Sequence, residues 1–182
     1  MRMLDLFSGL GGASAAMRER GWEVVTVDVE PRFGCTYTAD LRAWEPDGLG
    51  RFDLVWASPP CQEFSRWGMP WLRKNNPPPP SLELVEAARR IIRQVKPDWW
   101  VVENVRGASP FIRPILGEPR MYGAALLWGN FPDLGRVVVP PHKERLSSTQ
   151  LAERSKMPYP ISLALAKACE RATRHLFTEV ER

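Results

Sequence analysis

A short apolar run that ends in a cluster of glycines restricts the fold of this chain more than any other feature. Strand-like residues from Arg2 to Phe7 lead into glycines between Gly9 and Gly12. A helical stretch then extends from about Gly12 to Arg20, and a β-branched run follows from Glu23 to Val29. This order predicts a β-turn-α-β unit.

Strand and helix patterns continue to alternate through the rest of the 182 residues. The predicted elements are a strand at Phe52 to Ala57, a helix from Ser81 to Lys96, a strand at Asp98 to Glu103, a hairpin-like pair at Gly123 to Trp128 and Arg136 to Val139, and a last helix from about Pro160 to Leu176. Ser81 can cap its helix, and Pro97 stops it. We therefore expect a single α/β domain over residues 1–182 with a doubly wound, mostly parallel sheet.

Composition narrows the class of protein. The chain is 44% hydrophobic and 25% charged, as in an ordinary globular domain, and no apolar run approaches the roughly 20 residues of a membrane helix. The apolar stretch from Leu4 to Leu10 is too short for a signal peptide and contains Asp5. Three cysteines without paired spacing indicate neither a disulfide framework nor a zinc site. We expect a cytoplasmic protein that binds neither metal nor membrane.

The net charge of +4 makes the chain basic, which is typical of nucleic-acid-binding proteins. Between Arg66 and Arg106, eight Lys or Arg residues stand against four Asp or Glu residues, and this difference equals the excess of the whole chain. Four of these bases lie at the end of the helix predicted from Ser81, where we expect them to form a solvated face. The others that stand out are interleaved with tryptophans, an arrangement that suits phosphates and unstacked bases: Arg66, Trp67, Trp71, Arg73 and Lys74.

Cys61 follows two prolines, in Ser58-Pro59-Pro60-Cys61. Proline fixes φ and removes a donor, so the pair ends the preceding strand and stiffens the turn that carries the thiol. That turn lies at the carboxyl edge of the strand, where ligands of open α/β sheets bind. The position presents Cys61 for chemistry, although a lone cysteine in such a turn is as often buried and inert.

The glycine turn predicts a cofactor site, but not a site for NAD. Glycine lets backbone approach a ligand closely, but the third glycine of the dinucleotide pattern is replaced by Ser14, and no P-loop lysine is present. Acidic residues at successive strand ends can accept hydrogen bonds from a nucleoside, and each can equally be a turn or cap residue. The candidate cofactor-binding residues are Phe7, Gly9, Leu10, Gly11, Gly12, Asp28, its close competitor Glu30, Asp40 and Pro60.

Three motifs in order resemble the cytosine-C5 DNA methyltransferases. The first is Asp5-Leu6-Phe7-Ser8-Gly9-Leu10-Gly11-Gly12, which also resembles the first motif of S-adenosylmethionine-dependent methyltransferases in general. The second is Pro60-Cys61-Gln62 with Phe64-Ser65, and the third is Glu103-Asn104-Val105. The resemblance covers about Arg2 to Arg106. It implies a Rossmann-like S-adenosylmethionine-dependent methyltransferase fold, with S-adenosylhomocysteine as a product.

The resemblance also assigns roles that the chemistry needs. Cytosine C5 is a poor nucleophile, so the Cys61 thiolate would first add to C6. Glu103, with a pKa raised by burial, would bind N3 and the exocyclic amine of the base, and Asn104 would brace the loop that holds Cys61. Gln62, Ser65 and Arg106 would contact a substrate base that is flipped out of DNA.

The match becomes partial downstream. Pro141 to Leu146 resembles the eighth motif of the family, in which Arg145 would reach the base carbonyl or a phosphate and Lys143 replaces an arginine. The tenth motif is represented by the segment around Ser162, without the family's Gly-Asn pair. Only a linker of about residues 147–157 stands where family members carry a target-recognition region. We therefore expect low intrinsic sequence specificity, a protein partner that supplies it, or readout by the tryptophan-rich loop.

Other functions remain open on the sequence alone. The chain is expected to act on DNA, duplex or single-stranded, but it resembles a family of which one branch acts on transfer RNA. It would also suit a catalytically silent module that binds S-adenosylmethionine or DNA for a partner. A fourth alternative is transfer of a modified group from an S-adenosylmethionine derivative.

Overall fold

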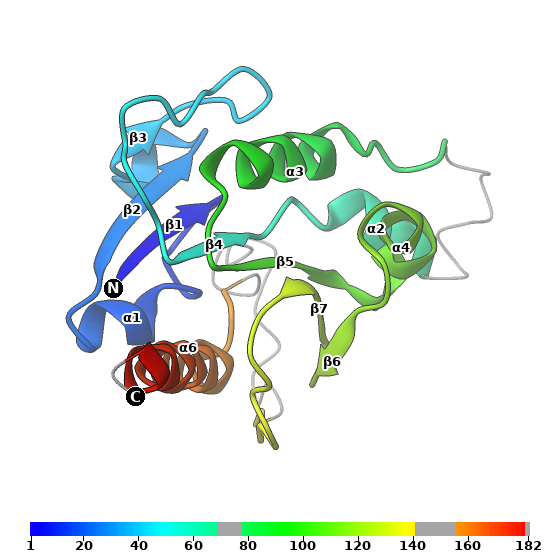
Figure 1. Cartoon of the computed structure of the whole chain (residues 1–182). Helices are drawn as coiled ribbons and strands as arrows, with labels where there is room; N and C mark the ends of the chain where they lie inside the picture. The colour runs from blue at the N-terminus through cyan, green and yellow to red at the C-terminus, as the bar shows by residue number, and fades with distance from the viewer. Residues whose placement is uncertain (69–77, 141–155, 181–182) are drawn as a thin grey trace.

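The computed structural model describes residues 1–68, 78–140 and 156–180, which form one sheet covered by helices (Figure 1). The strands are β1 (Arg2–Leu6), β2 (Glu23–Asp28), β3 (Tyr37–Thr38), β4 (Leu54–Ala57), β5 (Trp99–Val105), β6 (Arg120–Tyr122) and β7 (Ala125–Asn130). The helices are α1 (Ala15–Glu19), α2 (Gln62–Gly68), α3 (Glu83–Val95), α4 (Ser109–Leu116) and α6 (Tyr159–Val180), with 3-10 turns η1 (Pro31–Phe33) and η3 (Arg106–Ala108).

The sheet has seven strands in the order β3-β2-β1-β4-β5-β7-β6. Strands β1 to β5 pair in parallel, whereas β7 is antiparallel to both β5 and β6. The chain winds outward from β1 in one direction through β2 and β3, and in the other through β4 and β5. The prediction of a doubly wound, mostly parallel α/β sheet is confirmed.

Alternation along the strands divides the core into two layers. In β1, Met3 packs with α1 and α6 on one face, whereas Leu4 packs with α3 on the other. Successive side chains of a strand point to opposite faces, so a strand covered on both sides must be apolar throughout. All four residues of β4 are accordingly buried. Figure 1 shows α1 beside α6 on one side of the sheet and α3 on the opposite side.

The C-terminal hairpin differs from its prediction. Strand β7 pairs with β6, which precedes it, and residues 136–139 form no strand. A two-residue link, Gly123-Ala124, joins the strands, and Gly123 has a φ of 64°, which glycine adopts without strain. Val139 instead packs with its side chain against the Gly123 backbone. The short link therefore decided the pairing, while Val137 and Val139 pack against the core.

Two helices were missing from the prediction, α2 and α4. The sequence of α4 carries prolines at positions 110 and 114, which obscure its helical pattern. The helix predicted from Ser81 to Lys96 is present as α3, with Leu82 at its N-cap. The Ser81 hydroxyl accepts a hydrogen bond from the Glu83 backbone N–H at 3.3 Å, and Lys96 ends the helix in a left-handed conformation.

Candidate active site at the switch point of the sheet

The loops that follow β1 and β4 are neighbours, because β1 and β4 pair in parallel at the point where the winding of the sheet reverses. Open α/β sheets bind their ligands at this point, beyond the carboxyl ends of the strands. The glycine turn follows β1 and the Cys61 turn follows β4, so the fold brings the two strongest sequence motifs together. Glu103 joins them from β5, the next strand along the sheet.

The glycine turn is tied to β2 by Asp28. One oxygen of this buried carboxylate accepts a hydrogen bond from the Gly9 backbone N–H at 2.9 Å, and the other accepts one from the Glu30 N–H at 3.0 Å. Gly9 has a φ of 50°, and a Cβ atom placed on it would meet nothing within 4 Å. Asp28 therefore holds the turn in a left-handed conformation beside open space, while the exposed Glu30 forms an ion pair with Arg32.

A buried carboxyl group supports the same turn from below. Asp5 is 1% exposed, and its Oδ2 atom accepts hydrogen bonds from the hydroxyls of Ser8 at 3.0 Å and Ser14 at 2.7 Å. Burial raises the pKa of Asp5 from 3.8 to about 6, and the two hydroxyls oppose that shift. Asp5 lies in the first motif, but its hydrogen bonds to Ser8 and Ser14 were not predicted; the three-residue spacing from Asp5 to Ser8 was their only sequence signal.

We expect Asp5→Asn to change how stability depends on pH. The folded-state pKa of Asp5 is raised, so the stability that this group contributes is present below pH 3.8 and is lost as the pH rises to about 6. Asparagine keeps an acceptor for both hydroxyls and does not titrate. The unfolding free energy of the variant minus that of the wild type should increase from pH 4 to pH 6, by about 2 kcal/mol. A difference that stays constant in urea titrations across this range would contradict the expectation.

The far end of the glycine turn packs against the chain just before α6. A Cβ atom on Gly12 would lie 2.7 Å from the Met157 backbone nitrogen and 2.5 Å from Lys156 Cγ. Ser162, in α6, is completely buried; its hydroxyl donates to the Ala13 carbonyl at 2.6 Å and accepts from the Ala16 N–H at 3.1 Å. The structure thus places Gly12 and Ser162, both predicted to bind cofactor, where they join α6 to the back of the turn.

Gly12→Ala is expected to destabilise the fold, because the added methyl group would overlap backbone that cannot move aside as a side-chain end would. Overpacking of this kind costs about 1–3 kcal/mol. Thermal unfolding followed by circular dichroism should show a lower Tm than that of the wild type. An unchanged Tm would contradict a close contact between the turn and the segment before α6.

An apolar pocket of about 200 Å³ opens beside the turn. Its walls come from the carboxyl ends of several strands and from the start of α3: Phe7, Val29, Ala39, Asp40, Leu41, Arg42, Pro60 and Leu84. Two predicted cofactor residues, Phe7 and Pro60, form apolar walls, and Asp40 supplies a carboxylate at the rim. Leu10, at the tip of the glycine turn, is 42% exposed.

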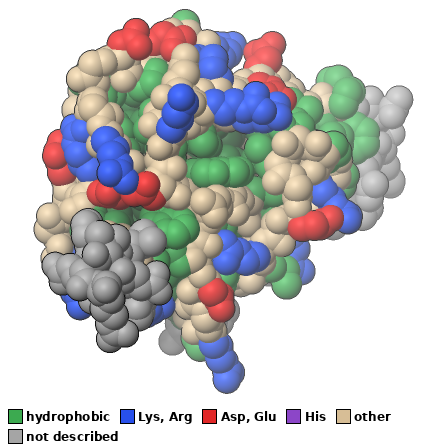
Figure 2. All heavy atoms as spheres, viewed as in Figure 1, with side chains coloured by type: hydrophobic (Ala, Val, Ile, Leu, Met, Phe, Trp, Pro, Cys, Tyr) green, Lys and Arg blue, Asp and Glu red, His purple; other side chains and the backbone are tan. Residues whose placement is uncertain are grey.

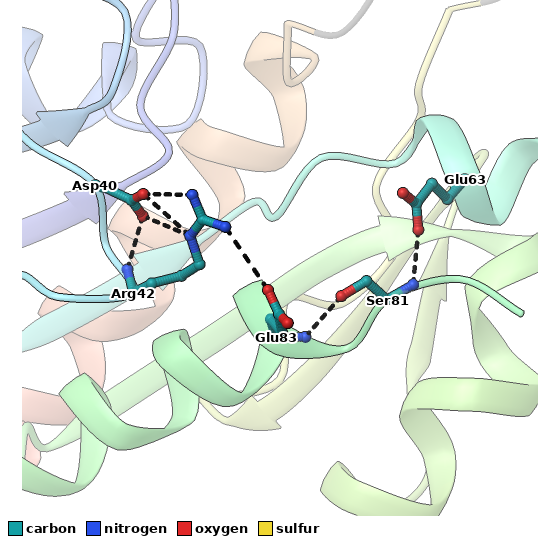
Figure 3. A network of polar contacts seen from close by, with 5 residues as sticks. All are labelled: Asp40, Arg42, Glu63, Ser81 and Glu83. Atoms are coloured by element: carbon teal, nitrogen blue, oxygen red, sulfur yellow. Dashed lines mark hydrogen bonds and ion pairs between the residues drawn. The ribbon is translucent and has the colours of Figure 1, made fainter.

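Asp40 is held by Arg42 in a network that Figure 3 follows from the pocket to α2. The Arg42 guanidinium donates to both oxygens of Asp40, at distances from 2.5 to 3.0 Å, and lies 3.7 Å from Glu83. These hydrogen bonds lower the pKa of Asp40 to about 2, so its carboxylate is ionised at neutral pH. Beyond Glu83, the Ser81 backbone N–H donates to Glu63 in α2 at 2.6 Å, so the network links the rim of the pocket to the helix that follows Cys61.

Cys61 is partly exposed and lies directly before α2. Its carbonyl accepts a hydrogen bond from the Ser65 N–H at 2.8 Å. Burial raises the pKa of the thiol, the charge of Glu103 raises it further, and a hydrogen bond from the Ser65 side chain opposes both. The free protein therefore keeps Cys61 as a thiol at neutral pH, and Glu103 is close enough to influence it.

Glu103 and Asn104 lie side by side in β5 and point to opposite faces of the sheet. Burial raises the pKa of Glu103 from 4.5 to about 7, opposed by a hydrogen bond from the Ser58 side chain. Asn104 is 1% exposed and donates from Nδ2 to the Pro59 carbonyl at 2.9 Å, while its Oδ1 accepts from the Val105 N–H. Asn104 therefore bonds to the backbone of the cysteine turn, which is the contact that the sequence predicts.

The predicted substrate-contacting residues are spread around this centre. Gln62 and Arg66 are exposed on α2, and Arg106 is exposed after β5, with a hydrogen bond to the Gly123 carbonyl. The Trp67 ring contacts Phe111 edge-on with centroids 5.6 Å apart, and its N–H donates to the Pro78 carbonyl, so it packs against the fold. The remaining candidates lie outside the described residues: Trp71, Arg73, Lys74, Lys143 and Arg145.

The surface is of mixed charge on the face seen in Figure 2. Hydrophobic side chains are visible near its centre, with Lys and Arg side chains around them and Asp and Glu side chains interspersed. Within the described residues no helix is long and apolar enough to cross a membrane. The same part of the chain contains no group of three His, Cys, Asp or Glu side chains placed to hold a metal ion.

Together, the doubly wound sheet and the glycine turn at its switch point define a Rossmann-like fold of the S-adenosylmethionine-dependent methyltransferase class. Solved structures agree on the fold: the Dnmt2 methyltransferase of S. pombe aligns with a TM-score of 0.50 at 18% identity, covering 86% of this chain and 56% of that one. The methyltransferase EhMeth of Entamoeba histolytica also aligns at 0.50, with 15% identity over 81% of this chain and 57% of that one.

The chain belongs to the C-5 cytosine-specific DNA methylase family, whose model matches residues 1–110. A probable DNA (cytosine-5)-methyltransferase of Frog virus 3 is 38% identical in an alignment of 117 residues that covers 57% of this chain and 53% of that protein. The type II methyltransferase M1.HphI of Haemophilus parahaemolyticus is 31% identical over 56% of this chain and 32% of its own length. The matches span about half or less of these relatives, and they confirm the family predicted from three motifs.

Proposed function

We propose that this protein transfers a methyl group from S-adenosylmethionine to C5 of cytosine in DNA, through a covalent adduct on Cys61. The observation that carries the proposal is the pairing of Cys61 with Glu103 at the switch point, beside an apolar pocket and a glycine turn. A thiol for addition and a carboxyl group that holds a proton near neutral pH are the two groups that cytosine activation requires.

The residues of the pocket fit the adenosyl part of this cofactor. Phe7, Pro60 and Leu84 offer apolar walls to a base, the ionised Asp40 can accept a hydrogen bond from an exocyclic amine, and the open side of Gly9 allows close approach. Glu30 is an exposed carboxylate near the end of β2 that can accept hydrogen bonds from the ribose hydroxyls. When bound, the cofactor supplies an electrophilic methyl group and leaves as S-adenosylhomocysteine.

The protein side of the reaction begins with the thiol. Ionised Cys61 forms a bond from sulfur to C6 of the base, and the displaced electron pair makes C5 nucleophilic. Protonated Glu103 donates to N3 and thereby stabilises the charge that develops on the ring. After methylation, a water molecule takes the C5 proton as base, and the C5–H electron pair forms the C5–C6 double bond as the sulfur–C6 bond breaks and releases the thiolate. The proton on N3 returns to Glu103, so both groups are regenerated. Asn104 keeps the cysteine turn in place throughout by its bond to Pro59.

The substrate is DNA with its target base outside the stack. Flipping a base from duplex DNA costs a few kcal/mol, and the cost falls for a single strand. Gln62, Ser65 and Arg66 lie in α2, which follows Cys61, and Arg106 follows β5, which carries Glu103; we propose that these polar side chains contact the base. We propose low intrinsic sequence specificity, which a protein partner can supplement, because so short a segment as 147–157 offers few side chains for readout in the major groove.

Nucleoside analysis tests this function. The protein is incubated with S-adenosylmethionine carrying a deuterated methyl group and, separately, with duplex DNA, single-stranded DNA and transfer RNA, and the digested nucleosides are measured by mass spectrometry. Labelled 5-methylcytosine in DNA is expected, at cytosines in many sequence contexts. Product in transfer RNA alone would replace the DNA assignment, and absence of product in all three pools would exclude the enzyme as proposed.

A further inference from the structure

Ser58 lies between a buried tryptophan and Glu103. The Trp56 side chain is completely buried, and its Nε1–H donates a hydrogen bond to Ser58 Oγ at 2.7 Å. An indole N–H can only donate, so the Ser58 oxygen is the acceptor in this bond and its own proton remains available for another partner. The orientation of the hydroxyl is therefore set from the core of the protein.

Strand register places Ser58 beside Glu103. Strand β4 pairs with β5 so that Trp56 is opposite Val101 and Ala57 is opposite Val102. The next residues are Ser58, directly after β4, and Glu103 in β5. The Ser58 backbone N–H donates to the Leu6 carbonyl at 3.2 Å, which fixes its position on the other side. On the same edge of the sheet, its hydroxyl acts on the Glu103 carboxyl group as a hydrogen-bond donor and opposes the rise in the pKa of that group. The three side chains thus form a series in which the Trp56 N–H is the hydrogen-bond donor to Ser58 and the Ser58 hydroxyl is directed to Glu103.

We propose that Ser58 is a positioning residue for Glu103: its hydroxyl, oriented by Trp56, donates to one carboxyl oxygen and leaves the other to present a proton to the substrate base. A carboxyl group without such a partner can place its proton on either oxygen and can rotate. Ser58 removes this freedom and stabilises the ionised form that exists after the proton has moved. The catalytic consequence rests on the proposed function, whereas the effect on Glu103 itself does not.

The surroundings of Glu103 make the effect of Ser58 measurable. Opposite Glu103 on β7 lies Leu127, which is apolar, and on β4 the facing group is the Ser58 hydroxyl. Within the described residues, the titratable group that interacts with Glu103 is the Cys61 thiol, which follows β4 and stays protonated near pH 7 because its pKa is raised. The charge of Glu103 near neutral pH therefore depends on burial and on Ser58.

Titration of Glu103 in Ser58→Ala tests the proposal. The ¹³C carboxyl resonance of labelled protein is followed against pH and assigned by its absence in Glu103→Gln. Loss of the hydrogen bond should raise the midpoint from near pH 7 by about one pH unit. Ser58→Thr, which keeps the hydroxyl, should titrate like the wild type, and Trp56→Phe, which leaves Ser58 without its donor, should move the midpoint in the same direction as Ser58→Ala. A midpoint unchanged in a folded Ser58→Ala variant would overturn the proposal.

The pH dependence of kcat/KM is a second measurement, and damage to packing alone would not shift it along the pH axis. If methyl transfer occurs, the pH at which kcat/KM stops rising should increase in Ser58→Ala by the same amount as the titration midpoint. A uniform loss of kcat/KM with the break unmoved would contradict the positioning role. If no methyl transfer is found but the titration shifts, the proposed function fails and the interaction between Ser58 and Glu103 stands, so the two failures are distinguishable.

Discussion

Cys61→Ala should reduce methyl transfer to background, because among the described residues of the site no other group can form the bond to C6 that activates C5. Where an enzyme nucleophile acts together with its partners, its removal costs on the order of 10⁶-fold in kcat. The variant should still fold and still bind S-adenosylmethionine, since the thiol is not among the walls of the apolar pocket. Incorporation of labelled methyl into DNA and calorimetric binding of the cofactor measure the two properties separately.

A covalent trap sharpens this test. DNA that carries fluorine in place of the C5 hydrogen of the target cytosine blocks the final proton loss, so protein and DNA should remain joined through Cys61 and be found by mass spectrometry of the digested complex. Cys35→Ala is the matched control, because Cys35 is also a partly exposed thiol and its loss should leave the adduct intact. Turnover that persists in Cys61→Ala, or turnover of wild type without any adduct, would refute the covalent route.

The second large effect is expected at Glu103, and it has a characteristic pH dependence. In the active form Glu103 is protonated and Cys61 is ionised, so the two groups together carry one proton. The pKa of Glu103 is raised to about 7, and the pKa of Cys61 is raised above its usual value. Below pH 7 both groups are protonated, and kcat/KM should rise about tenfold per pH unit as one proton is lost. Above pH 7 the pair holds one proton, and kcat/KM should be level until Cys61 ionises fully.

Glu103→Gln should lower kcat by about 10²- to 10⁴-fold, because glutamine can donate a hydrogen bond to N3 but cannot share its proton. The level region of the pH profile should disappear with it. Glu118→Gln, at an exposed ion pair with Arg113, is the control and should retain both rate and profile. If the wild-type kcat/KM instead rose about a hundredfold per pH unit below pH 7 and continued to rise above it, Glu103 would be acting as a carboxylate.

Local patterns were sufficient to predict the parallel part of the fold. Strands β1, β2, β4 and β5 are buried runs between turn residues, and α3 carries its apolar residues at helical spacing, so each could be recognised without its neighbours. Strand β6 and helix α4 could not. The three residues of β6 have no pattern of their own, and they pair only because the turn at Gly123 returns the chain onto β7.

The same distinction applies to the site. Cys61, Glu103 and Asn104 stand in motifs that can be read along the chain, and the bond from Asn104 to Pro59 follows from two strand ends that meet at one edge. The contact between Ser58 and Glu103 depends on the register of β4 against β5, which short sequence patterns do not specify. Likewise, Ser162 could be placed in a motif, but its bonds to Ala16 in α1 and to Ala13 just before that helix span 146 and 149 residues of sequence.

Because of those long-range bonds, the parts of the cofactor site form at different times during synthesis of the chain. The back of the glycine turn is completed by Ser162 and by the backbone at Met157, which lie about 150 residues further along the chain. A polypeptide still emerging from the ribosome thus has its glycine turn long before it has the helix that supports it. We expect cofactor affinity to appear late in synthesis, when α6 docks. By linkage, cofactor that binds the finished turn should slow the release of α6 and protect the C-terminal helix from proteolysis.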